Sequence, residues 1–338
     1  MLMVGIGGPV LAEHERAWLA APGVAGVVLF ARNYVDRPQL LALVESIRRA
    51  GGEHMLVAVD QEGGPVQRFR AGFTRLPALA RIGAVYDRDP AAAIELAEEH
   101  AWVMASELRA CDVDFSLAPV VDLARGNAAI GERAFHADPH AVAELAQAYV
   151  RGMHLAGMAA VLKHFPGHGS VQADTHKDAA VDLRSLEEIR QQDLVPFAAG
   201  IESRAEAVLM AHVAYPLVDE YPAGFSSAWI GQVLRGELRF AGVVMSDDIG
   251  MAAAAAVGDV AARVRSHLDA GCDLVLACAP ETVPEALTAV AEPDAAVLAR
   301  VAWLRGAAAP TWAGLEDNPQ YRRFVDRIRA LELPEHPA

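Results

Sequence analysis

Residues 163–178, KHFPGHGSVQADTHKD, concentrate side chains that can move protons or bind metal ions. Three of the twelve histidines lie here, and Asp174 and His176 are separated by a single residue. In a loop, the Asp174 carboxylate can accept an imidazole N–H from His176, which fixes the tautomer and stabilises the imidazolium. The spacing therefore favours acid–base chemistry by this pair.

Two other interpretations of the segment stay open. Three histidines and an aspartate are chemically adequate zinc ligands, although a metal site in a barrel would draw its ligands from several strand ends. A proline and a glycine separate His164 from His168, so these two are not a metal-binding pair on one helical face. In the third interpretation the loop is held by its own hydrogen bonds. Independently of these interpretations, we expect His168 to organise the glycine turn.

Further polar residues stand where short apolar runs end. They are Asp60, Asp122, Lys163 with His164, His212, and Asp247 with Asp248. In a barrel of parallel strands these ends meet on one face, which predicts a polar pocket. Adjacent strand residues point in opposite directions, so only one of Asp247 and Asp248 is expected to enter the barrel mouth, and the other can hold a neighbouring loop. The entering carboxylate suits attack on an anomeric carbon, or metal binding.

The apolar runs that carry these ends alternate with helical patterns. We expect strands at residues 1–7, 26–30, 56–60, 113–122, 158–165, 207–213, 242–248 and 272–278, and helices at 90–111, 141–157, 185–201 and 259–271. Ser185 and Glu188 have the spacing of a capping box. Near-continuous apolar strands suit a parallel sheet covered on both faces. About eight such βα pairs predict an α/β fold: a single-domain (β/α)8 TIM-type barrel over residues 1–338, with a helical tail from about residue 310.

Composition narrows the classes of function. The formal charge of -15 repels phosphate backbones, so nucleic acid is not an expected partner. The three cysteines, Cys111, Cys272 and Cys278, lack CxxC spacing and are expected to be buried thiols in a reducing compartment. The chain shows neither a basic leader nor an apolar run near the ~20 residues of a membrane span. We therefore expect a cytoplasmic protein without membrane contact.

Four motifs in the expected order resemble those of the family 3 glycoside hydrolases. They are VDQEGGPVQRF, KHFPGHG, ADTH and VVMSDDIGM. Within that family the chain is similar to the compact, single-domain β-N-acetylhexosaminidases of bacterial peptidoglycan recycling, from about Gly26 to about Pro280. One departure is Pro65, where these enzymes more often carry arginine.

The resemblance implies a role for each matching residue. Asp247 would be the nucleophile that forms a covalent glycosyl-enzyme intermediate, and His176 the general acid/base with Asp174 as its partner. The sugar-binding residues would be Asp60, Arg68, Arg133, Lys163 and His164. The family needs no metal for this chemistry, and no cofactor is expected.

The implied function is retaining hydrolysis of terminal β-linked N-acetylglucosamine from muropeptide fragments such as GlcNAc-1,6-anhydro-MurNAc and its peptides. We expect the protein to be a monomer. Retaining glycosidases normally use two carboxylic groups. A histidine, whose ordinary pKa is near neutral, would take one of these roles here. A neutral histidine repels phosphate less than a carboxylate does, so a β-N-acetylglucosaminide phosphorylase is an alternative. A metal-dependent barrel hydrolase and a non-catalytic sugar-binding protein are less favoured.

Overall fold

Eight short apolar runs form one parallel sheet in the computed structural model, which describes residues 1–171, 180–251, 254, 257–308 and 310–331. The strands are β1 (Leu2–Gly5), β2 (Val24–Leu29), β3 (Leu56–Val59), β6 (Phe115–Ser116), β7 (Val161–Phe165), β9 (Ala207–Met210), β11 (Val243–Asp248) and β12 (Leu274–Ala277). Their residues are buried almost throughout, as expected of strands covered on both faces.

The sheet closes on itself in the order of the chain. β1 pairs with both β2 and β12, and β7 pairs with β9. Isolated parallel bridges, Phe115 to Ala159 and Val120 to Lys163, join the β6 region to the β7 region. The expected (β/α)8 barrel is therefore confirmed, and the carboxyl ends of all its strands lie on one face.

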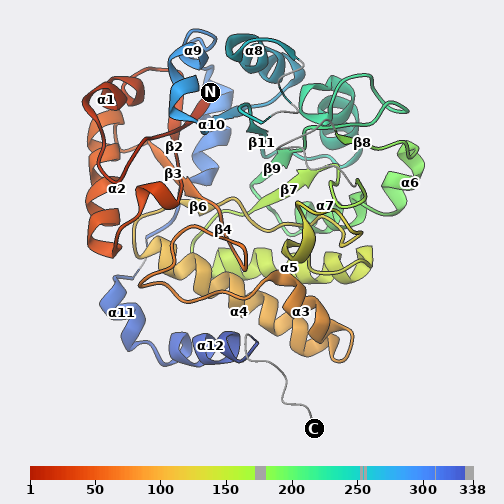
Figure 1. Ribbon diagram of the computed structural model, residues 1–338. Coiled ribbons are helices and arrows are strands. Elements are labelled where there is room, and N and C mark those ends of the chain that lie inside the picture. Colours follow the sequence, from red (N-terminus) through yellow and green to blue (C-terminus); the bar gives the residue numbers. More distant parts are fainter. Residues whose placement is uncertain (172–179, 252–253, 255–256, 309, 332–338) are drawn as a thin grey trace.

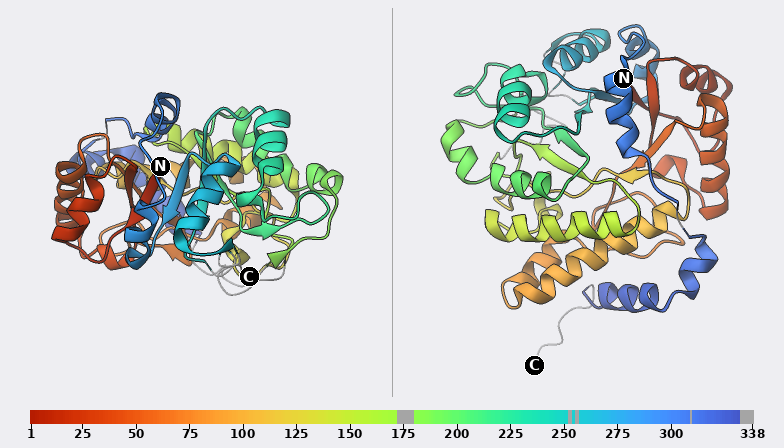
Figure 2. Two further views of the ribbon diagram at one scale, coloured as in Figure 1. Left: turned by 90° about the horizontal axis from the view of Figure 1, so that it is seen from above. Right: turned by 180° about the vertical axis from the view of Figure 1, so that it is seen from behind.

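Helices surround the barrel (Figures 1 and 2). They are α1 (Glu13–Leu19), α2 (Arg37–Gly51), α3 (Leu79–Tyr86), α4 (Pro90–Arg109), α5 (Pro139–Leu155), α6 (Leu186–Gln191), α7 (Leu194–Glu202), α8 (Val260–Ala270), α9 (Val283–Leu287) and α10 (Ala295–Val301). The 3₁₀ helices are η1 (Ala31–Asn33), η2 (Gly131–Arg133), η3 (Ala223–Phe225), η6 (Pro280–Thr282) and η7 (Ala302–Leu304), and η4 (Ala228–Glu237) is a π-helix. The capping box of Ser185 and Glu188 is present at the start of α6, as predicted.

Two predicted elements differ from the structure because of proline. The expected strand at 113–122 contains a regular strand only at β6, since Pro119 has no N–H to donate to a ladder. The expected helix at 185–201 is divided into α6 and α7. Pro196 cannot donate to the carbonyl four residues earlier, and it instead lies in the first turn of α7, where no such bond is needed.

Two small sheets lie outside the barrel wall. β8 (Ala180–Val181) pairs with β10 (Val213–Ala214), and β4 (Gln61–Gly63) forms a hairpin with β5 (Val66–Gln67) directly after β3. Buried glutamines tie the hairpin to the loop that follows it. The Gln61 side chain exchanges two hydrogen bonds with the backbone of Phe69, at 2.8 and 3.0 Å. The hairpin therefore holds its flanking polar residues in fixed positions.

The C-terminal tail lies along the outer side of α4 (Figure 1). It consists of α11 (Trp312–Asp317) and α12 (Pro319–Ala330). Trp312 Nε1 donates to the Cys111 sulfur at 3.0 Å, and the Tyr321 hydroxyl donates to Glu107 at 2.6 Å. The three cysteines are free and buried, as predicted. In the described part of the chain no helix is long and apolar enough to cross a membrane.

Candidate active site

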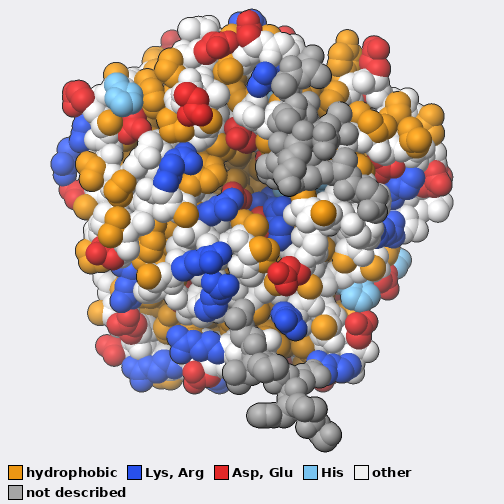
Figure 3. All heavy atoms as spheres, viewed as in Figure 1, with side chains coloured by type: hydrophobic (Ala, Val, Ile, Leu, Met, Phe, Trp, Pro, Cys, Tyr) orange, Lys and Arg blue, Asp and Glu red, His pale blue; other side chains and the backbone are white. Residues whose placement is uncertain are grey.

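A cavity of about 760 Å³ opens at the carboxyl ends of the strands. Apolar side chains of Val28, Leu117, Leu209 and Leu276 contribute to its lining, and charged side chains complete it. Six residues predicted for the site line this one cavity: Asp60, Arg68, Arg133, Lys163, His164 and Asp247. The remaining two, Asp174 and His176, lie outside the described residues. Figure 3 shows the hollow, with Lys and Arg side chains gathered along one edge.

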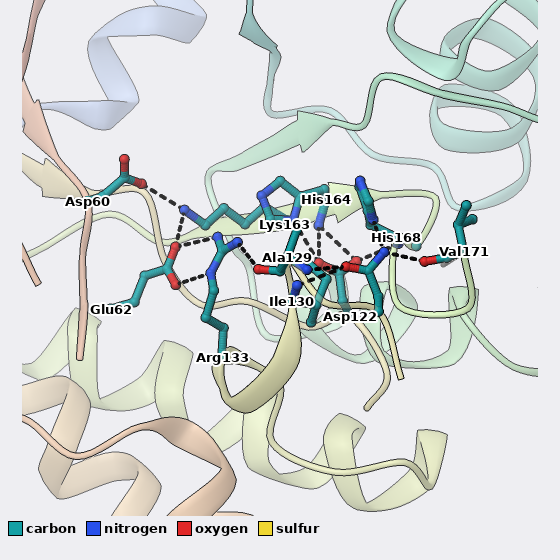
Figure 4. Close-up of polar contacts among 12 residues, drawn as sticks. Asp60, Glu62, Asp122, Ala129, Ile130, Arg133, Lys163, His164, His168 and Val171 are labelled. Carbon is teal, nitrogen blue, oxygen red and sulfur yellow. Dashed lines mark hydrogen bonds and ion pairs between the residues drawn. The ribbon is translucent and has the colours of Figure 1, made fainter. Parts of the chain in front are cut away.

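Five charged residues form a compact network in the cavity wall, and Figure 4 labels four of them, Asp60, Glu62, Arg133 and Lys163. Lys163 Nζ lies 2.8 Å from Asp60 Oδ1 and 2.6 Å from Glu62 Oε1. The Arg133 guanidinium donates one hydrogen bond to each carboxylate oxygen of Glu62, both at 2.8 Å. Arg68 reaches the second oxygen of Asp60 at 3.2 Å. Each carboxylate thus meets two cations, which is the arrangement that makes burial of charge tolerable.

The network keeps its members ionised. Burial opposes ionisation of Asp60, but Lys163 and Arg68 outweigh it and hold the pKa of that carboxyl below its usual range. Burial likewise opposes charge on Glu62, and Arg133 and Lys163 hold its pKa low. The pKa of Lys163 is raised, because the two carboxylates overcome the cost of burying the ammonium. The wall therefore offers fixed charges to a ligand's hydroxyl groups.

A second cluster centres on the buried carboxylate of Asp122 (Figure 4). His164 Nδ1 lies 2.7 Å from Asp122 Oδ2, and the backbone N–H of His168 donates to Oδ1 at 2.7 Å. Burial works against the charge, but the facing His164 and the His168 N–H lower the pKa of Asp122. With Nδ1 committed to Asp122, the Nε2 of His164 is the ring nitrogen left for a ligand.

Asn127 connects the Arg133 segment to the loop after β7. Its side-chain oxygen accepts from the N–H groups of Ala129 and Ile130 at 2.8 and 2.9 Å. Its amide nitrogen lies 3.1 Å from His168 Nδ1 and donates to the carbonyl of Val171. The predicted part of His168 in organising its turn agrees with these contacts, and Asn127 is the partner that the sequence did not suggest.

The carboxylates of Asp247 and Asp248 end β11. Both line the cavity, so the expectation that only one would reach the barrel mouth is not met. Their surroundings differ nevertheless. Asp248 accepts backbone N–H groups of Gly250 and Cys278, both at 3.1 Å, and so holds two loops together as one of the pair was expected to do. Burial and the neighbouring Asp247 raise the pKa of Asp248.

His212 does not line the cavity, although it follows a strand end. β9 ends at Met210, and the His212 ring stacks on Phe225 at 5.5 Å. Its Nε2 lies 3.2 Å from Nε2 of His267, which donates from Nδ1 to the Gly224 carbonyl at 2.7 Å. These contacts pack the two histidines against Phe225, away from the cavity.

Sequence reasoning missed Glu62 as a site residue. A signal existed, because Asp60 and Glu62 are two residues apart and side chains alternate along an extended chain, so both point to one face. The sequence identifies Asp122 as the end of a strand, but it does not predict the contact with His164. That contact arises because the pairing of Val120 with Lys163 brings the two segments together.

Within the described residues no group of three or more His, Cys, Asp and Glu side chains could hold a metal ion. Nearly every site carboxylate is occupied by a cation or by backbone N–H groups. The charged side chains of this cavity can hydrogen-bond to hydroxyl groups, and Asp247 adds a carboxylate at the end of a rigid strand.

Comparison with known proteins agrees with this geometry. Residues 1–302 match the family model described as the glycosyl hydrolase family 3 N terminal domain. A β-hexosaminidase of Xylella fastidiosa strain 9a5c is 56% identical over 328 residues, which cover 97% of this chain and 98% of that protein. A β-hexosaminidase of Stenotrophomonas maltophilia strain K279a is 60% identical over 290 residues, covering 86% of this chain and 87% of that protein.

Among solved structures, native NagZ from Neisseria gonorrhoeae superposes with a TM-score of 0.92 at 39% identity, and covers 98% of both chains. The same protein in complex with N-trifluoroacetyl-D-glucosamine gives the same TM-score and identity. The family model and the relatives are all glycoside hydrolases, which agrees with the charged cavity described above. This chain belongs to glycoside hydrolase family 3, among the β-hexosaminidases of the NagZ type.

Proposed function

We propose that this β-hexosaminidase removes terminal β-linked N-acetylglucosamine from muropeptide fragments, in a retaining reaction through a covalent intermediate on Asp247. The observation that carries the proposal is the constellation of Asp60, Lys163, Arg68 and His164 around the cavity that Asp247 also lines. Paired charges and a fixed imidazole suit the hydroxyl groups of one hexosamine, and the strand-end carboxylate suits its anomeric carbon.

The reaction has two steps. In the first, an oxygen of Asp247 bonds to the anomeric carbon while the glycosidic C–O bond breaks, and His176 gives its proton to the departing oxygen. In the second, His176 takes a proton from water, the water oxygen bonds to the anomeric carbon, and the bond to Asp247 breaks. Two inversions restore the β configuration. Asp174 orients His176 and stabilises its charged form.

The setting of the reaction is the cytoplasm, where a monomeric enzyme would act in peptidoglycan recycling and so support cell-wall biogenesis, cell shape and division. The similarity to a neisserial protein solved with an N-trifluoroacetyl glucosamine supports an amino sugar in the cavity. Size-exclusion chromatography with light scattering tests the monomer: a mass near 35.9 kDa is expected, and twice that mass contradicts it.

Substrate reactivity tests the assignment of roles. Asp247→Ala should abolish turnover of every glycoside. His176→Ala should spare 2,4-dinitrophenyl N-acetylglucosaminide, whose leaving group needs no proton, and lose activity on a muropeptide by about 10²–10⁴-fold. Asp269→Ala, an exposed change on α8, is the control. If the first two variants behave alike on the activated glycoside, the acid/base role is wrong.

Two additions to the wild-type assay separate the other classes of enzyme. Turnover should survive excess EDTA, and complete loss would favour a metal-dependent hydrolase. Added phosphate should leave N-acetylglucosamine as the product, and a sugar phosphate would identify a phosphorylase instead.

A further inference from the structure

Beside the sugar cavity lies a smaller hollow of about 240 Å³, here named the arginine cavity. Arg70, Arg75 and Arg81 line it, together with Glu132, Gly64, Pro65 and Ala78. Positive charge therefore exceeds negative charge in its wall. The whole chain carries a formal charge of -15, so this concentration of guanidinium groups is a local feature.

The arginines of this hollow differ from those of the sugar cavity. Arg68 and Arg133 each have a carboxylate partner. Arg75 and Arg81 are exposed, and neither side chain makes a hydrogen bond or ion pair with the part of the chain that the structure describes. Three arginines and one glutamate line the hollow, so positive charge is in excess there, and a bound anion would offset it.

The walls of the arginine cavity are held in place from within. Arg70 Nε donates to the carbonyl of Gln67 at 3.0 Å. The buried Gln67 side chain donates to the carbonyl of Thr74 at 2.9 Å and accepts the N–H of Leu76 at 3.1 Å, so the loop that bears Arg70 and Arg75 is tied to the hairpin. The backbone that carries Arg70 and Arg75 is thus held in place, which lowers the part of the entropy cost of binding that comes from ordering a loop.

The hairpin turn also packs closely on the segment before α3. A Cβ on Gly64 would lie 2.6 Å from the Cβ of Ala78, and the φ of Gly64 is +53°, so only glycine suits this position. That close approach brings Arg81, in the first turn of α3, to the same hollow.

The arginine cavity adjoins the sugar cavity. Pro65 and Glu132 line both, so a ligand seated in the larger one can extend into the smaller. At about 240 Å³ the hollow is smaller than the roughly 300–1,000 Å³ of sites that hold a whole ligand. It therefore suits one group of a larger molecule.

We propose that the arginine cavity binds a carboxylate of the peptide carried by the substrate's aglycone, an inference that rests on the proposed function. Arginine presents a planar fork that matches a carboxylate with two parallel N–H···O bonds. A peptide of three residues spans up to about 10 Å, enough to place a free carboxylate beyond the bond being cleaved. The cavity then selects acidic fragments by binding them and leaves bond cleavage to the neighbouring site.

Steady-state kinetics with matched substrates tests this. The double variant Arg75→Gln/Arg81→Gln is assayed on a muropeptide with free carboxylates, on the same muropeptide with its carboxylates amidated, and on neutral 4-methylumbelliferyl N-acetylglucosaminide. We expect kcat/KM to fall by about tenfold on the free acid, mainly through KM, and to stay unchanged on both neutral substrates. Arg265→Gln, an exposed arginine on α8, should change nothing.

Three results would overturn the inference. Equal losses on all three substrates would assign the arginines to structure alone. No loss on the free acid would show that no carboxylate binds there. Competition by inorganic phosphate, with wild-type enzyme cleaving the amidated and free substrates equally well, would make the cavity a phosphate site. A wild-type enzyme inactive on the neutral glycoside would instead contradict the proposed function itself.

Discussion

Two regions of this barrel bury titratable side chains and treat their charge in opposite ways. At the mouth, Asp60, Glu62 and Lys163 stay ionised because each meets an opposite charge within 3.2 Å. Away from the mouth, His100 and His267 are fully buried and have no carboxylate partner among the described residues, and burial lowers the pKa of both imidazoles. Ion pairs favour the charged forms at the cavity, where we propose that a sugar binds, and burial favours the neutral forms of the two packed histidines.

The hydrogen bonds of His100 illustrate the neutral case. Its Nε2 lies 3.1 Å from the carbonyl of Pro77, and its Nδ1 lies 3.2 Å from the hydroxyl of Tyr149. One donor and one acceptor satisfy a neutral imidazole completely, whereas an imidazolium would need two acceptors. The stabilities of the charged region and of the neutral histidines should therefore respond differently to mutation and to pH.

The largest effect should come from breaking the charged region. Glu62→Gln leaves Lys163 and Arg133 buried against fewer counter-charges, so we expect the free energy of unfolding to fall by about 3–5 kcal/mol and turnover to be lost. Denaturant unfolding measures the first effect. Glu13→Gln, whose ion pair with Arg16 is exposed, should cost less than about 0.5 kcal/mol. Similar losses in the two variants would contradict the account.

The neutral region should respond to pH. Burial lowers the pKa of His100 to about 4 from an ordinary value of 6.5. Between these values the unfolded chain binds a proton that the folded chain does not, so stability is fully present above pH 6.5 and is lost as pH falls toward 4. The expected loss is up to about 3 kcal/mol.

The variant His100→Gln should flatten the dependence of unfolding free energy on pH between 6.5 and 4, measured by denaturant melts. His14→Gln, at an exposed histidine, is the control. In the charged region the low pKa values of Asp60 and Glu62 place their loss of stability below the ordinary carboxyl range, near pH 4 and lower. If the charged region and His100 lost unfolding free energy over the same pH range, the proposed difference between the two regions would be wrong.

Removing the Asp122 carboxylate, which orients the His164 ring, should have a smaller effect on activity. Asp122→Asn removes the carboxylate that accepts from His164 and His168, so the His164 ring is less firmly held. We expect KM for an aryl N-acetylglucosaminide to rise about tenfold with a lesser change in kcat. An unchanged KM would show that His164 does not meet the sugar through this orientation.

The smallest effect on activity should come from the histidine pair behind the wall. His267→Gln removes the ring that stacks on Phe225 at 3.9 Å and the ring-nitrogen contacts with His212 and Gly224, and should lower stability by about 1–2 kcal/mol. Because neither His212 nor His267 lines the sugar cavity, kcat/KM should stay within about twofold of wild type. A larger loss of activity would mean that the two regions are coupled.

Sequence reasoning predicted the barrel well because its signal is local. β-branched apolar runs identify strands wherever they lie, and all eight expected strands joined the barrel sheet. Pro119 and Pro196 changed the lengths of two elements, and the reason was already visible in proline's missing N–H.

The site was less predictable because its contacts join distant segments. Lys163 and Asp60 are 103 residues apart in the chain, and only closure of the sheet brings them to 2.8 Å. His212 shows the opposite error: a polar residue after a strand end suggested the pocket, yet the chain turns after Met210 and directs the ring to His267. Position at a strand end predicts a face of the barrel, and the side chain's direction depends on the packing beyond it.

Trapping the covalent intermediate tests the central claim most directly. Wild-type enzyme is incubated with a 5-fluoro N-acetylglucosaminyl fluoride, which slows the second step, and the labelled peptide is mapped by mass spectrometry. We expect one label per chain, on Asp247, and none in Asp247→Ala. Label on Asp248 or on another residue would contradict the assignment of Asp247. Turnover of the donor without any labelled enzyme would contradict the covalent mechanism.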